Sequence, residues 1–184
     1  MAVAQEVSLL AALRARTAAQ HAALDDAFRG ALTRDRYVAF LQASLAVLAR
    51  LEPALATWLP AAVTPSRVER LRADLAALGA APGADAGNVA VPATRAASLG
   101  AAYVVEGSTL GGLMLAERFE RALGIGLEAT TYLRLRGRDT ARHWRGFLAE
   151  LATAAASDAA EACAAAAATF DAYAAAMRAH GALA

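Results

Sequence analysis

Residues 6–28 read EVSLLAALRARTAAQHAALDDAF, and the spacing of the larger side chains in this stretch decides the fold class. The side chains that recur at steps of three and four are Leu10, Leu13, Thr17, His21, Leu24 and Phe28. An α-helix has 3.6 residues per turn, so these steps place all six on one helix face. The stretch therefore predicts an amphipathic helix over residues 6–28.

The composition of the whole chain also favours helices. Alanine, the strongest helix former, accounts for 56 of the 184 residues, whereas there is a single Ile. β-Branched residues, which favour strands, are correspondingly few. A chain of this length is large enough to bury one core without disulfides. We expect one all-α domain spanning residues 1–184.

Caps and helix breakers divide the rest of the chain into further elements. Thr33 predicts the N-cap of a second helix that bends or breaks before Pro53. Thr64–Pro65 predicts the start of a short helix that ends at Leu78. The remaining predicted elements are a surface loop over 79–92, a helix over 93–123, a helix over 139–151 and a last helix that starts at Ser157–Asp158.

Charge and cysteine content exclude several classes of function. The 18 basic residues, all Arg, nearly balance 17 acidic ones, which argues against a nucleic-acid partner. The single Cys163 excludes an intrachain disulfide and a multi-thiolate metal site. No unbroken apolar run reaches the roughly 18 residues of a membrane span, and residues 1–24 lack the pattern of a secretory signal. We expect a cytoplasmic protein that does not bind a membrane.

His21 is the first candidate for chemistry, because it lies on the apolar face of the first predicted helix. Arg14 precedes it by two turns, about 10 Å along the axis at ~1.5 Å per residue. That offset suits a flat ligand with a metal at its centre and anionic groups at its edge. The alternatives are a core histidine bonded to a backbone carbonyl and a solvated surface arginine. His143 and His180 are the other histidines, among charged residues and near the C-terminus respectively.

Four glycines interrupt the helix predicted over 93–123. Gly100, Gly107 and Gly111 are spaced by seven and four residues and share one predicted face, with Gly112 beside them. Each costs a helix roughly 1 kcal/mol relative to alanine. One interpretation is close packing against another helix. The other is a bent surface without side chains, against which a planar ligand can press.

Four stretches of the chain resemble one protein family. LRARTAAQHAALDDAF (13–28) resembles the proximal-helix signature of haem oxygenases, and GAAYVVEGSTLGGLML (100–115) resembles the distal helix of their bacterial biliverdin-producing branch. RGRDTARHWRGFLAEL (136–151) and AAATFDAYAAAMR (166–178) resemble the last two helices of the family. The resemblance implies a multihelical fold in which haem is sandwiched between a proximal helix and a kinked distal helix.

The resemblance also implies roles for individual residues. The haem-binding set is His21 as axial ligand of the iron, Arg14 at a propionate, and Tyr103, Gly107, Gly111 and Phe170 around the ring. The set assigned to catalysis is Gly107, Gly111 and Ser108. Ser108 stands where animal-type enzymes carry an Asp that organises distal water, so the route of protons stays open. Which of Arg134, Arg136, Arg138 or Arg142 completes the propionate site is also open.

The implied reaction opens haem b, which is both substrate and cofactor and carries the iron. O₂ and an external electron donor such as a ferredoxin or flavin reductase are required, because the chain has no flavin or dinucleotide fingerprint. The products are biliverdin, CO and iron, for iron release or for supply of chromophore to a bilin-binding photoreceptor. The alternatives are a non-catalytic haem carrier or sensor on the same fold, another enzyme that uses Cys163 or Glu106, and a helical interaction module.

Overall fold

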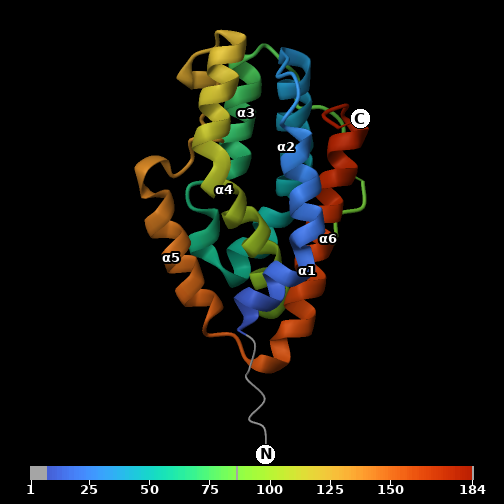
Figure 1. Cartoon of the computed structure of the whole chain (residues 1–184), viewed down its shortest axis with the longest axis vertical. Coiled ribbons are helices and arrows are strands. Elements are labelled where there is room, and N and C mark those ends of the chain that lie inside the picture. Colours follow the sequence, from blue (N-terminus) through green and yellow to red (C-terminus); the bar gives the residue numbers. More distant parts are fainter. Residues whose placement is uncertain (1–7, 86, 184) are drawn as a thin grey trace, which may run out of the picture.

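The computed structural model describes residues 8–85 and 87–183, which form a bundle of six α-helices (Figure 1). These are α1 (Leu9–Ala27), α2 (Arg34–Trp58), α3 (Arg67–Ala77), α4 (Arg95–Leu123), α5 (Thr140–Leu151) and α6 (Ala159–Ala179). Short 3₁₀ helices occur at Pro60–Val63, Leu127–Ala129, Gly137–Asp139 and Ala156–Asp158. The described residues contain no β-strand. The prediction of a single all-α domain is confirmed.

Side-chain caps set where several helices begin. The hydroxyl of Thr33 accepts a hydrogen bond from the backbone N–H of Arg36 at the start of α2, as predicted. The expected start of the third helix at Thr64–Pro65 is wrong, because α3 begins two residues later, at Arg67. Ser66 caps it by accepting from the N–H of Glu69, and the Thr64–Pro65 peptide bond, which is cis, precedes the helix.

The predicted bend or break before Pro53 does not end α2, which continues to Trp58 with the proline inside it. A proline within a helix removes one backbone hydrogen bond and crowds the preceding turn. Leu51 and Leu55, on either side of Pro53, are both completely buried. Tertiary packing therefore holds the helix together where the local sequence predicts an interruption.

α6 holds α1 and α4 next to each other, because it packs along both of them. Its buried face includes Ala166, Phe170, Tyr173 and Met177, at the heptad-like spacing of the sequence. α2 packs against α3 and α6 on the other side of the core. The axis of α4 bends along its length (Figure 1), and Gly107, Gly111 and Gly112 lie in the middle part of this helix. α1 and α4 are thus held by a common helix.

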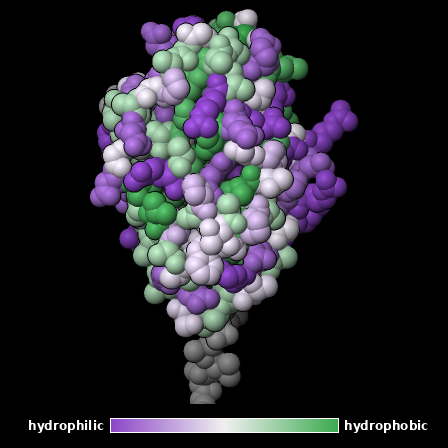
Figure 2. Space-filling view, turned by 180° about the vertical axis from the view of Figure 1, so that it is seen from behind, coloured by the Kyte–Doolittle hydropathy of each residue, from purple (hydrophilic) through white to green (hydrophobic). Residues whose placement is uncertain are grey.

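α2 and α4 are long and apolar enough, by length and composition, to span a membrane. Charged residues interrupt both helices, so neither contains an unbroken apolar run as long as a membrane span. Of the two apolar windows, 67% and 50% respectively are buried inside the protein, as in the core helices of soluble proteins. On the face shown in Figure 2, hydrophilic residues are interspersed among hydrophobic ones.

Candidate functional site

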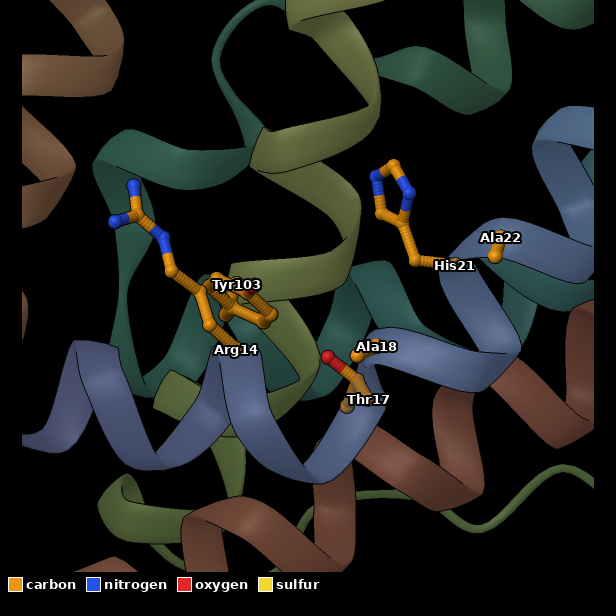
Figure 3. Close-up of a pocket in the computed structure, with 6 residues that line it drawn as sticks. All are labelled: Arg14, Thr17, Ala18, His21, Ala22 and Tyr103. Atoms are coloured by element: carbon orange, nitrogen blue, oxygen red, sulfur yellow. The ribbon is translucent and has the colours of Figure 1, made fainter.

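A pocket of about 400 Å³ lies between α1 and α4 (Figure 3). Its lining residues are Arg14, Thr17, Ala18, His21 and Ala22 from α1 and Tyr103 from α4. The fold therefore brings Tyr103 of α4 to Arg14 and His21 of α1, and the sequence had singled out all three. The small side chains of the two alanines leave room in front of the imidazole.

His21 lies where the buried face of α1 reaches the surface. Leu13 and Thr17, two turns and one turn earlier on that face, are buried, whereas His21 is exposed. The Thr17 hydroxyl donates to the carbonyl of Leu13, so its hydrogen-bond partner lies within the same helix. The interpretation of His21 as a core histidine is therefore wrong, because its ring projects from α1 into the pocket (Figure 3).

Phe170 supports the imidazole from α6. The two rings meet edge to face, with centroids 6.0 Å apart and an interplanar angle of 64°. Phe170 is buried and is not among the residues that line the pocket. In this structure it packs against His21, whereas the sequence placed it in the pocket wall.

Arg14 and Tyr103 form the other end of the pocket. Arg14 is exposed, and its side chain extends from α1 in the part of the pocket that Tyr103 also lines (Figure 3). Tyr103 is half-buried, and its ring lies 6.2 Å from that of Trp144 on α5. A cationic group at one end and an imidazole at the other match a ligand with an anionic edge and a metal centre.

The four glycines of α4 separate into two pairs with different surroundings. A Cβ built on Gly100 would lie 2.0 Å from the carbonyl oxygen of Ala162 on α6. A Cβ on Gly112 would lie 2.5 Å from the carbonyl oxygen of Leu133. Both glycines are buried, and both are required by close backbone packing. The spacing predicted that Gly100 shares one face with Gly107 and Gly111. The close contact with Ala162 shows that Gly100 does not belong to an open surface that could face a ligand.

Gly107 and Gly111 have space in front of them. A Cβ on Gly107 would come no closer than 3.9 Å to Trp144, and one on Gly111 would meet nothing within 4 Å. Tyr103, Gly107 and Gly111 are spaced by four residues, so this open surface continues the pocket along one face of α4. Leu110 and Met114, on the same part of α4, are 50% and 67% exposed. Such an exposed apolar surface is typical of a binding site.

Ser108 is exposed, and its hydroxyl donates to the carbonyl of Val105 at 2.9 Å. Burial raises the pKa of Tyr132, and the charge of Arg67 and neighbouring hydroxyl groups oppose this effect. Burial also raises the pKa of Tyr173 well above its ordinary value. Both phenols therefore keep their protons at neutral pH. No sequence pattern distinguished these two tyrosines, since Tyr173 lies on the buried face of α6 and Tyr132 lies in the connection before α5.

The four arginines left open for the propionate site lie elsewhere. Arg134 makes two hydrogen bonds to the carboxylate of Glu120, and Arg136 is buried beside Glu106. Arg142 pairs with Asp139 on the surface, and Arg138 is exposed. None of the four lines the pocket that contains Arg14.

Trp144 faces Gly107. The sequence did not single it out, although it stands next to His143.

These features define an all-helical protein with a candidate site for a planar, metal-centred ligand. The available donors fit haem, since His21 offers a nitrogen ligand, Arg14 a cation for a propionate, and the open glycine face a flat surface. The sequence model of a protein family described as heme oxygenase matches residues 7–179. The chain therefore belongs to the haem oxygenase family, which binds haem as its substrate. No match was found among curated proteins.

Proposed function

We propose that this protein opens haem b to biliverdin, CO and iron, with O₂ and electrons from a separate donor. The observation that carries the proposal is the pairing of an exposed imidazole on α1 with an uncovered backbone on α4. His21 provides the first, and Gly107 and Gly111 provide the second. Bound haem supplies the iron that activates O₂ and the ring that is oxidised.

The residues on α1 hold and orient the substrate. His21 would hold the iron through a ring nitrogen, and Phe170 packs against the imidazole with the two ring centroids 6.0 Å apart. Arg14 pairs with a propionate at the solvent edge of the pocket, because its side chain is exposed. A neutral imidazole ligand keeps the iron able to take O₂, whereas a thiolate favours cleavage of the O–O bond.

The residues on α4 shape the opposite side. Gly107 and Gly111 let the backbone approach the ring and leave space for a diatomic molecule. The polar side chain next to Gly107 on its C-terminal side is Ser108, whose hydroxyl is bonded to a backbone carbonyl. Leu110 and Met114 lose exposed apolar surface when the ring covers them, which excludes water and contributes about 25 cal/mol per Å².

The test is to add haemin to the purified protein and then a reductant under air. We expect a Soret band on binding, followed by its loss as biliverdin forms and CO is released. A ferredoxin system and a flavin reductase should each be tried as donor, because the chain needs external electrons. A Soret band that persists under reductant and air, or bleaches without biliverdin, would overturn the proposal.

A haem carrier or sensor is the second candidate, and the state of Ser108 favours it. A side chain already bonded to the Val105 carbonyl at 2.9 Å is a poorer proton donor to a ligand than a carboxylic acid. A stable oxygenated or reduced haem complex in the same experiment would support this candidate. If biliverdin forms, its fate then separates iron release from chromophore supply to a bilin-binding photoreceptor.

A further inference from the structure

A second cavity, of about 450 Å³, lies between the end of α2, the 3₁₀ helix after it, α4 and α5. It shares no lining residue with the pocket around His21. Trp58, Pro60 and Phe147 provide apolar walls, and Trp58 is 42% exposed. Glu106 and Arg136 provide charged groups at its inner side. The cavity therefore combines an apolar wall with a buried charged floor.

The charges beneath this cavity do not balance. Arg67 and Arg136 both bind the same carboxylate oxygen of Glu106, with N–O distances of 2.9 and 3.4 Å. All three residues are more than nine-tenths buried. Two guanidinium groups on one carboxylate carry a net charge of +1 away from water. Buried charge is costly unless it is paired and hydrogen-bonded.

The same cluster contains donors without acceptors. The Nε–H groups of Arg67 and Arg136 are buried and have no hydrogen-bond partner, although their terminal nitrogens donate to backbone carbonyls and Glu106. Arg136 lines the cavity. Burial lowers the pKa of Arg136, the repulsion of Arg67 adds to this effect and Glu106 opposes it. An arginine nevertheless stays protonated in proteins, so the excess charge persists.

The neighbouring carboxylates are engaged elsewhere. Glu52 accepts from the backbone N–H groups of Arg67 and Val68 and from the hydroxyl of Ser66, so it caps α3. Glu150 lines the cavity but pairs with Arg95 on the surface. Neither Glu52 nor Glu150 forms an ion pair with Arg67 or Arg136, which share the carboxylate of Glu106.

We propose that this cavity binds a small carboxylic acid with an aromatic or other apolar body. The carboxylate would neutralise the excess charge and accept from Arg136, and the ring would lie against Trp58 and Phe147. Charge-assisted hydrogen bonds of this kind are among the stronger ones in proteins. This site is independent of haem binding, since His21 takes no part in it.

Benzoate is the probe that tests the proposal, with benzamide as its neutral analogue and inorganic phosphate as an anion without an apolar body. Calorimetry on the haem-free protein should give saturable benzoate binding, with benzamide and phosphate at least tenfold weaker. In a Trp144→Phe variant, benzoate should also change the fluorescence of Trp58. Equal affinity for benzamide or phosphate would overturn the proposal, as would no saturable binding, which would mean that water occupies the cavity.

Variants locate the site. Arg136→Met should weaken benzoate binding at least tenfold without lowering the melting temperature, because it leaves Glu106 paired with Arg67 alone. Arg134→Met, which removes the charged partner of Glu120 instead, should bind benzoate like the wild type.

Trp58→Ala leaves the ion cluster intact, and it should weaken benzoate binding severalfold even if the Arg136 variant does not fold. His21→Ala should leave benzoate binding unchanged. Wild-type benzoate affinity in both the Arg136 and Trp58 variants would overturn the proposal.

Discussion

At the scale of single residues, the proposed chemistry depends most on His21. Its ring is exposed in the pocket and packs against Phe170. His21→Ala should remove the axial ligand, shift the Soret band and abolish biliverdin formation. Added imidazole should restore part of the Soret band and part of the biliverdin formation, because it can occupy the space that the side chain leaves. Absorption spectra and product yield measure these effects.

His143→Ala is the matched control, since His143 lines the second cavity. It should keep the wild-type Soret band and rate. If the His143 variant loses them and the His21 variant does not, the assignment of the axial ligand is wrong.

Arg14 allows a second prediction at the same scale. An exposed ion pair contributes up to about 1 kcal/mol, which is roughly fivefold in affinity. Arg14→Glu replaces attraction by repulsion at the propionate and should weaken haem binding roughly five- to tenfold. Arg16→Glu makes the same change of charge at a residue of α1 that lies near Cys163. It should weaken haem binding less than Arg14→Glu does. Haem titration of both variants at one ionic strength is the measurement, and equal affinities would exclude the Arg14 contact.

At the scale of elements, α4 offers a pair of neighbouring glycines with opposite surroundings. Gly111→Ala meets open space and should leave the protein as stable as before or add up to about 1 kcal/mol of helix stability. Gly112→Ala would press a methyl group against the Leu133 carbonyl at 2.5 Å and should lower the melting temperature markedly. Thermal unfolding of the two variants without haem measures this difference.

The same variants separate packing from function. Gly111→Ala should slow biliverdin formation per folded molecule, because its methyl group occupies space beside the ring. Gly111→Val should slow it further. Unchanged turnover in both variants would mean that the open glycine face is not used in the reaction.

At the scale of the whole molecule, the free energy of unfolding should depend on pH through Glu120 and Asp74, whose pKa values are shifted in opposite directions. Hydrogen bonds from Arg134 hold the pKa of Glu120 below its ordinary value. Its stabilising contribution is therefore present at neutral pH and is lost as the pH falls through the lowered pKa. Burial raises the pKa of Asp74, so its protonation favours the folded state and opposes that loss.

Glu120→Gln should flatten the loss of stability on acidification. The uncharged amide cannot form the charged pair with Arg134, so the variant should be less stable near neutral pH and converge with the wild type in acid. Melting temperatures between about pH 3 and pH 7 measure both curves. Parallel curves over this range would show that the pair does not contribute to acid sensitivity.

The pocket residues on α1 were predictable because they are local in sequence. Arg14 and His21 are seven positions apart, which is two turns of one helix, so their common direction follows from helix geometry alone. Tyr103 was predictable only through resemblance to a family. Its approach to α1 depends on packing against α6, which no local pattern describes. Trp144, Tyr132 and Tyr173 carried no distinguishing signal, because single aromatic residues are usual in cores and these three come from different segments of the chain.

The sequence by itself determined the helical class, the order of the helices and most of their boundaries, because alanine content, periodicity and caps act over a few residues. Tertiary structure decided the rest. It carried α2 through Pro53, since burial of the flanking leucines outweighs a local defect. It also separated Gly100 and Gly112 from Gly107 and Gly111, which have the same side chain and differ only in what another part of the chain places in front of them. Contacts between distant segments are settled by the packing of the whole core.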